Sequence, residues 1–112
     1  MPRSDAPGAA ALTPETTNVA VLNGTTIPGL ASTEKDKIVS AGFKGKVTTG
    51  NNTDQARATS QVMYGTRSGA RTQARTIARK LDIATIQRLD ADTRDLSSNA
   101  DVVVIVGQDK AP

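Results

Sequence analysis

Residues 19–24 read VAVLNG, and residues 102–107 read VVVIVG. Each stretch is a short run of apolar residues that stops at a glycine. The first run predicts a buried strand. The second has five apolar residues without a break, which predicts a strand buried on both faces.

The segment after the first strand is expected to form a helix. Pro28 suits its first turn, where the missing N–H costs nothing, and Gly42 is a good end signal just after Ala41. Its apolar stripe is thin and consists of Leu30, Ile38 and Ala41, with Phe43 just beyond. Glu34 and Lys37 fall within this stripe at helical spacing.

Residues 68–81 form the clearest predicted helix, because one apolar stripe runs along it. The stripe consists of Ala70, Ala74, Ile77, Ala78 and Leu81. Shorter strands are predicted at residues 44–50, 61–65 and 84–88, the last with the alternation of an edge strand. The order is therefore βαββαββ, an α/β two-layer sandwich with one mixed sheet of about five strands. Right-handed crossovers place both helices on one face of that sheet.

The composition excludes several classes of enzyme. The 112 residues suffice for one domain, and they include no cysteine and no histidine. These absences exclude disulfides, thiolate metal sites, cysteine nucleophiles and most histidine-based hydrolysis or zinc chemistry. No cofactor and no metal site is predicted. Phe43 and Tyr64 are the aromatic residues, so the core must be aliphatic.

The net charge of +3 is unevenly distributed along the chain. Residues 57–88 hold seven basic residues against one aspartate, residues 1–56 are neutral, and residues 89–112 carry a net charge of −3. A basic middle indicates contact with an anionic partner. The acidic residues 90–100 are predicted to form a loop.

The ends of the chain lack the pattern of a folded element. Residues 1–17 hold three of the five prolines and predict a flexible linker, followed by a domain over 18–109 and a tail over 110–112. No apolar run approaches the ~18–20 residues of a membrane span or forms a signal peptide. Taken as written, the chain would be cytoplasmic. A targeting segment or membrane anchor could lie upstream in a longer protein.

The turn after the first strand is one candidate binding site. Backbone N–H groups where a strand leads into a helix can hold an anion, and threonine hydroxyls add donors. The candidate residues are Asn23, Gly24, Thr25, Thr26 and Gly29. The junction lacks the glycine and lysine spacing of a P-loop. The alternative is a tight turn before an ordinary helix, with Thr26 as its cap.

A row of arginines is the second candidate. Arg67, Arg71 and Arg75 are spaced one helical turn apart, and Arg79 continues the row. Guanidinium groups at this spacing could bind phosphates or carboxylates. The alternative is a solvated helix face beside the acidic C-terminal segment.

Two other functions remain open from the residues. Ser32 and Lys35 match S-x-x-K, so a Ser/Lys- or carboxylate-dependent cell-wall hydrolase or transferase is one alternative, although the companion S-D-N and K-T-G elements are missing. A cytoplasmic nucleic-acid binder is the other, against which the scarcity of aromatic residues argues. Asp90, Asp92 and Asp95 do not complete a calcium loop, because neither its glycine nor its terminal glutamate follows.

Three parts of the sequence resemble the LytR C-terminal domain family. Residues 19–25, VAVLNGT, with residues 28–31, PGLA, and 41–43, AGF, are similar to its opening. Residues 100–109, ADVVVIVGQD, are similar to its closing strand. The apolar stripe of the second predicted helix is similar to the family's second helix. The resemblance covers roughly residues 18–109.

The resemblance implies a non-catalytic, extracytoplasmic domain that follows either a LytR-CpsA-Psr catalytic domain or a membrane anchor with a Pro/Ala-rich linker. Nothing here is similar to that catalytic domain, so no catalytic residue is assigned. We therefore expect a module that binds an anionic cell-wall glycopolymer, peptidoglycan or an envelope protein and supports glycopolymer assembly. The chain departs from the family pattern at Glu34, Lys35 and Lys37, where small apolar residues are usual.

Overall fold

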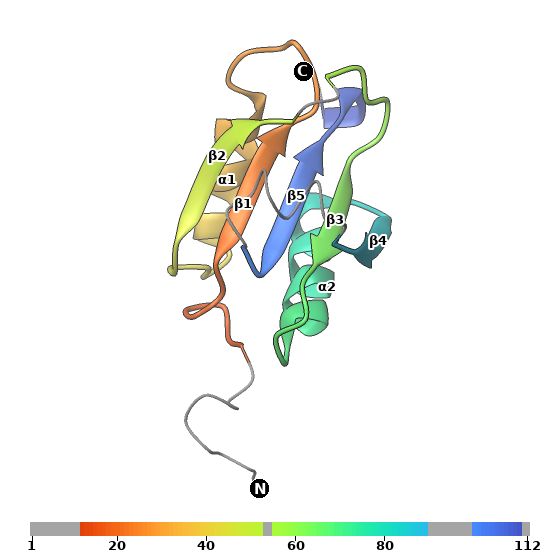
Figure 1. Ribbon diagram of the computed structural model, residues 1–112. Helices are drawn as coiled ribbons and strands as arrows, with labels where there is room; N and C mark the ends of the chain where they lie inside the picture. Colours follow the sequence, from red (N-terminus) through yellow and green to blue (C-terminus); the bar gives the residue numbers. More distant parts are fainter. Residues whose placement is uncertain (1–11, 53–54, 90–99, 111–112) are drawn as a thin grey trace, which may run out of the picture.

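The computed structural model describes residues 12–52, 55–89 and 100–110. They form one five-stranded sheet, two α-helices and a short 3-10 helix (Figure 1). In chain order the elements are β1 (Val19–Asn23), α1 (Leu30–Ser40), β2 (Val47–Asn51), β3 (Gln61–Tyr64), α2 (Ala70–Leu81), β4 (Thr85–Arg88), β5 (Val102–Val106) and η1 (Gln108–Lys110). The predicted order βαββαββ is confirmed.

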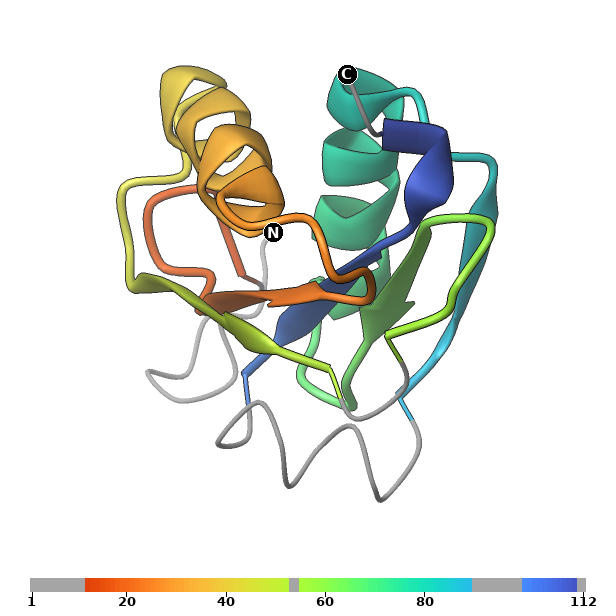
Figure 2. The same cartoon turned by 90° about the horizontal axis from the view of Figure 1, so that it is seen from above.

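The sheet is mixed and has the strand order β2-β1-β5-β3-β4. Strand β1 is parallel to both β2 and β5, and β3 is parallel to β4, whereas β3 and β5 are antiparallel. Both helices cover the same face of the sheet (Figure 2), as right-handed crossovers require. The two strand–helix–strand units therefore run in opposite directions across one sheet.

The main core lies between the sheet and the helices. It combines one face of the strands with the apolar stripes of both helices, and it is almost entirely aliphatic apart from Phe43. The strand residues in it are Val19, Val21, Val62, Val102, Val104 and Val106. The opposite face carries a second buried cluster of Ala20, Leu22, Met63, Leu89, Val103 and Ile105. Strand β5 is thus buried on both faces, as its sequence predicts.

Helix α1 begins later than its proline suggests and ends where its glycine predicts. Pro28 lies in the preceding turn, and Gly29 is the N-cap residue with φ 83°, without a side-chain hydrogen bond. The expectations that Pro28 occupies the first helical turn and that Thr26 caps it were wrong. The reason is that Gly29 adopts the left-handed conformation, so the helical residues begin at Leu30, two residues after the proline.

Glu34 is buried within the apolar stripe of α1, with 1% of its surface exposed. Its Oε2 lies 3.0 Å from Nζ of Lys37, which is exposed, and its Oε1 has no hydrogen-bond partner. An unpartnered buried carboxylate oxygen destabilises the native state, because folding strips it of water without replacing the lost hydrogen bond.

We expect Glu34→Met to raise the free energy of unfolding by about 1–2 kcal/mol, since methionine keeps the length and helix propensity without the charge. Lys37→Met should have the opposite sign, because it leaves the buried carboxylate without its ion pair. Urea unfolding followed by circular dichroism measures both changes. A loss of stability in Glu34→Met would contradict this assignment.

Part of the predicted linker contacts the domain. The side chain of Leu12 is buried, its N–H donates to the Ser68 carbonyl at 2.8 Å, and its carbonyl accepts from Nε2 of Gln73 at 2.9 Å. Gly45 packs so closely against the Thr17 carbonyl that a Cβ there would lie 2.7 Å from that oxygen. Residues 12–17 therefore contact the start of α2 and the segment that follows α1. The division of the chain at residue 17 stays a prediction.

Candidate functional site

The junction between β1 and α1 is held by its own side chains. Oδ1 of Asn23 accepts from the Thr25 N–H at 2.9 Å and from the Thr25 hydroxyl at 2.7 Å. Nδ2 of Asn23 donates to the Ile27 carbonyl at 2.7 Å, and the Ile27 N–H donates to Oγ1 of Thr25 at 3.1 Å. The Gly24 N–H is bonded to the Val106 carbonyl at 2.8 Å. These amides are occupied within the chain, and anion binding here stays a prediction.

A pocket opens beside this junction. Its volume is about 340 Å³, and it lies between the first turn of α1 and the carboxyl ends of β1 and β2. The lining residues are Asn23, Pro28, Gly29, Ala31, Ser32, Thr49, Gly50 and Asn51. Of the predicted junction residues, Asn23 and Gly29 line the pocket, whereas Gly24, Thr25 and Thr26 do not. The lining carries no charged side chain.

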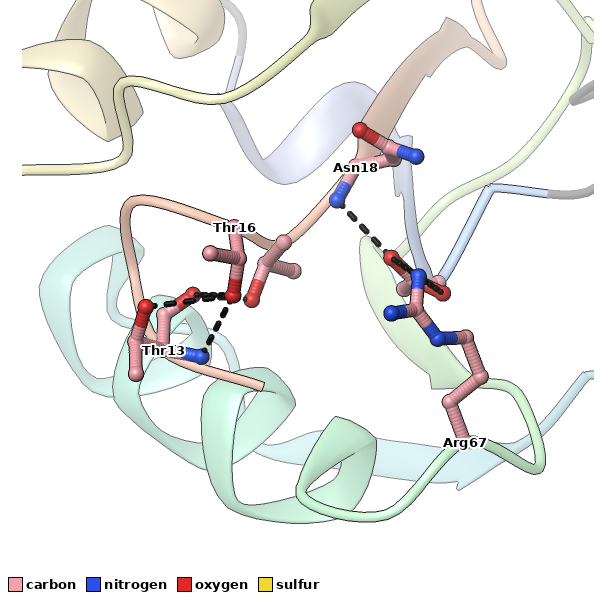
Figure 3. Close-up of polar contacts among 6 residues, drawn as sticks. Thr13, Thr16, Asn18 and Arg67 are labelled. Carbon is pink, nitrogen blue, oxygen red and sulfur yellow. Dashed lines mark hydrogen bonds and ion pairs between the residues drawn. The ribbon is translucent and has the colours of Figure 1, made fainter. Parts of the chain in front are cut away.

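Arg67 is part of a structural contact. Its Nη1 lies 3.2 Å from both carboxylate oxygens of Asp101, which is buried just before β5. The same carboxylate accepts from the Asn18 N–H at 2.9 Å, so it joins the start of β1 to the loop before α2 (Figure 3). To the left of Arg67 in Figure 3, the segment with Thr13 and Thr16 closes a turn through hydrogen bonds to the Thr16 hydroxyl. Arg67 is therefore engaged within the chain.

Arg71, Arg75 and Arg79 are exposed and form no ion pair or hydrogen bond through their side chains within the described residues. Each lies on the solvent side of α2, whose other face is buried in the core. Lys80 lines a pocket together with residues of α1. It follows Arg71 by nine residues, so the two side chains lie on opposite sides of α2. Arg71 and Arg75 thus lie on the flank of α2 that faces away from α1, and Arg79 lies on its solvent side. We call these three arginines the arginine row.

The β1–α1 junction and Arg67 lie at opposite ends of the sheet. The β1–α1 junction follows the carboxyl end of β1, whereas Arg67 follows the carboxyl end of β3. Strand β5 is parallel to β1 and antiparallel to β3, so those two carboxyl ends point in opposite directions. The structure therefore does not bring the junction and Arg67 into one site.

The residues of the enzymatic alternative form no catalytic arrangement in the described part of the chain. Ser32 is exposed in the pocket, and no hydrogen bond joins it to Lys35. Among residues 12–52, 55–89 and 100–110, no group of three acidic side chains could hold a metal ion. The predicted loop with Asp90, Asp92 and Asp95 lies outside the described residues. No helix within the described ranges is long and apolar enough to cross a membrane.

Sequence reasoning missed two aspartates that anchor the strand ends. Besides Asp101, Asp109 accepts a hydrogen bond from the Ser60 hydroxyl at 2.6 Å and lies within 3.2 Å of its N–H. The Ser60 hydroxyl oxygen in turn accepts from the Gly107 N–H at 2.8 Å. Asp101 and Asp109 flank the strongly apolar run of β5. This position was the one feature of the sequence that could have indicated their structural role.

Comparison with known proteins supports the resemblance found in the sequence. A family model described as LytR_C, LytR cell envelope-related transcriptional attenuator, matches residues 16–109. The solution structure of the C-terminal domain of RV0431 is similar, with 28% identity and a TM-score of 0.55 over 96% of this chain and 86% of that one. A search of the curated proteins found no match.

A second solved structure shares the fold. It is the crystal structure of the soluble domain of a conserved hypothetical secreted protein (Rv2700 ortholog) from Mycobacterium marinum. The two chains are 22% identical, with a TM-score of 0.57 over 88% of this chain. This chain spans 64% of the length of that domain.

Proposed function

The chain belongs to the LytR_C family of envelope proteins, and from this premise we propose that it is a non-catalytic, extracytoplasmic binding domain. Its ligand is an anionic cell-wall glycopolymer, which it holds through the arginine row of α2, and this contact supports glycopolymer assembly. The secreted neighbour from Mycobacterium marinum is consistent with an extracytoplasmic location.

The observation that carries the proposal is the combination of exposure and missing partners along the arginine row. Arg71, Arg75 and Arg79 recur every four residues, so successive Cα atoms rise by about 6 Å along the helix. Their guanidinium groups have no carboxylate partner among the described residues. A row of evenly spaced cations suits a linear polymer with repeated anionic groups, because several charge-assisted hydrogen bonds can form at once.

A protein partner or a nucleic acid could also contact a basic surface, but the site favours the polymer. The arginine row carries no neighbouring aromatic platform for bases, because the chain has one tyrosine and one phenylalanine and Phe43 is fully buried. A flexible polyanion needs no shaped pocket, which fits the exposed helix face.

We expect Arg71→Ala/Arg75→Ala to weaken retention of the purified domain on insoluble cell-wall sacculi by about tenfold. Two surface contacts of roughly 0.5–1 kcal/mol each account for this loss. Retention should also fall as salt rises, because exposed charges are screened. A co-sedimentation titration measures the bound fraction.

The matched control is Lys44→Ala/Lys46→Ala, which removes the same charge from exposed positions at the start of β2. The retention of this variant should fall by less than about threefold. It removes only the general electrostatic attraction, to which both pairs of cations contribute alike. Equal losses in the two double variants would show that net charge alone retains the domain and would overturn the role of the arginine row.

A further inference from the structure

The outer edge of strand β2 is open to pairing. Strand β2 ends the sheet and, among the described residues, pairs with β1 alone (Figure 1). Its last four residues are exposed. Edge strands are usually protected by charges, prolines or bulges, because their free backbone groups template another strand. The sequence of β2, VTTGN, contains no charge and no proline.

The hydrogen bonds to β1 show which backbone groups of β2 point outward. The Val19 N–H donates to the Lys46 carbonyl at 2.8 Å, and the Asn52 N–H donates to the Asn23 carbonyl at 3.0 Å. Alternate residues of a parallel strand bond to the same neighbour. Residues 46, 48, 50 and 52 therefore face β1, and Val47, Thr49 and Asn51 direct both N–H and C=O away from the sheet.

The pocket at the start of α1 lies beside this open edge. Val47 packs against the helix-side core, and Thr49 and Asn51 share its face because side chains alternate along a strand. Both line the pocket together with Ser32 and Ala31 of α1. A strand added to β2 would direct alternate side chains toward this pocket. Its uncharged lining, with the polar side chains of Ser32, Thr49 and Asn51, suits a small polar side chain.

Charge gives the added strand an orientation. Lys44 and Lys46 are exposed beside the start of β2, and neither has an ion pair within the described ranges. An acidic residue on the partner strand would be attracted to this end. Antiparallel pairing is the more stable arrangement for an added strand, and it places the acidic residue at the carboxyl end of the partner segment.

We propose that the β2 edge is a docking site for an extended peptide segment of a partner protein, added as an antiparallel strand. The segment places a serine, threonine or alanine side chain in the pocket beside α1 and an acidic residue near Lys46. This site is separate from the arginine row and does not depend on polymer binding.

The test uses heptapeptides selected from a random displayed library against the wild-type domain, then synthesised and titrated by fluorescence anisotropy. The selected peptides should have small polar residues at alternate positions and an acidic carboxyl-terminal residue. Thr49→Pro should weaken their binding by at least about tenfold, because proline removes an outward N–H and blocks the edge. That N–H is not bonded to β1, so the sheet should tolerate the change.

Thr48→Val is the control, since Thr48 is exposed, does not line the pocket and keeps every outward N–H, and this variant should bind within about threefold of wild type. Lys46→Glu provides a second test that leaves the strand backbone intact, and it should lower the affinity for the acidic peptides severalfold. Selected peptides that bind Thr49→Pro and Lys46→Glu as well as wild type would overturn the proposal. A library that yields no binding peptide would also overturn the proposal. A wild-type dimer that Thr49→Pro dissociates would do the same, because a second copy of this chain would then occupy the β2 edge.

Discussion

Phe43→Ala is expected to lower the free energy of unfolding by about 3–5 kcal/mol, which is a large share of the roughly 5–15 kcal/mol typical of a domain. Phe43 is the largest of the fully buried side chains and has no exposed surface. The surrounding core is made of valine, isoleucine, leucine and alanine. Removal of the ring leaves a cavity that short, branched neighbours cannot refill.

Local geometry fixes the position of this ring. Gly42 has φ 105°, a left-handed conformation that favours glycine, and it turns the chain back after α1. The Gly42 N–H then donates to the Val39 carbonyl at 3.0 Å and the Phe43 N–H to the Ile38 carbonyl at 3.4 Å. These two bonds form a Schellman motif, whose usual apolar contact here joins Phe43 to Ile38.

The control for Phe43→Ala is Val39→Ala, because Val39 lies close by in the last turn of α1 but is 41% exposed. It should change the free energy of unfolding by less than about 1 kcal/mol. Urea unfolding of both variants, followed by circular dichroism, gives the comparison. A loss below about 1 kcal/mol for Phe43→Ala would contradict the placement of this ring in the core.

Asp101→Ala is expected to have the second largest effect, a loss of about 2–3 kcal/mol in the free energy of unfolding. The carboxylate is 4% exposed and binds Asn18 and Arg67 at the starts of β1 and α2. Its removal leaves the Asn18 N–H without its acceptor where three elements meet. Charge-assisted hydrogen bonds of this kind are stronger than neutral ones.

Arg67→Ala should cost less than about 1 kcal/mol, because the side chain of Arg67 is 59% exposed and water can replace it. The unequal losses distinguish a buried anchor from its exposed partner. A loss in Arg67→Ala as large as that in Asp101→Ala, measured by the same urea titration, would contradict this account. Arg67→Ala should also retain wall binding, since the arginine row excludes Arg67.

Much of the fold could be predicted from local signals. These signals act over only a few residues; they are the run VVVIVG, the glycine after α1 and the alanine-rich stripe of α2. Each predicted element formed close to its expected place. Strand β2 begins at Val47, three residues later than expected, and ends one residue later, at Asn51. The helices begin after left-handed glycines. Such boundaries depend on single φ values that composition does not reveal.

The arrangement of the sites could not be predicted in the same way. The sequence order βαββαββ does not fix where β3 lies in the sheet or its direction beside β5. That direction alone separates the β1–α1 junction from Arg67. The contact between Asn18 and Asp101 likewise spans 83 residues. The exposure of Arg71 and Arg75 could be predicted from helical periodicity. The ion pair of Arg67 with Asp101 could not, because it depends on how the complete sheet is arranged.

Polymer binding by the arginine row is tested most directly by co-sedimentation of the wild-type domain with sacculi that retain their anionic glycopolymers and with sacculi stripped of them. We expect strong, salt-sensitive retention on the intact sacculi and its loss on the stripped ones. Equal retention on both preparations, or retention on neither, would contradict polymer binding by the arginine row.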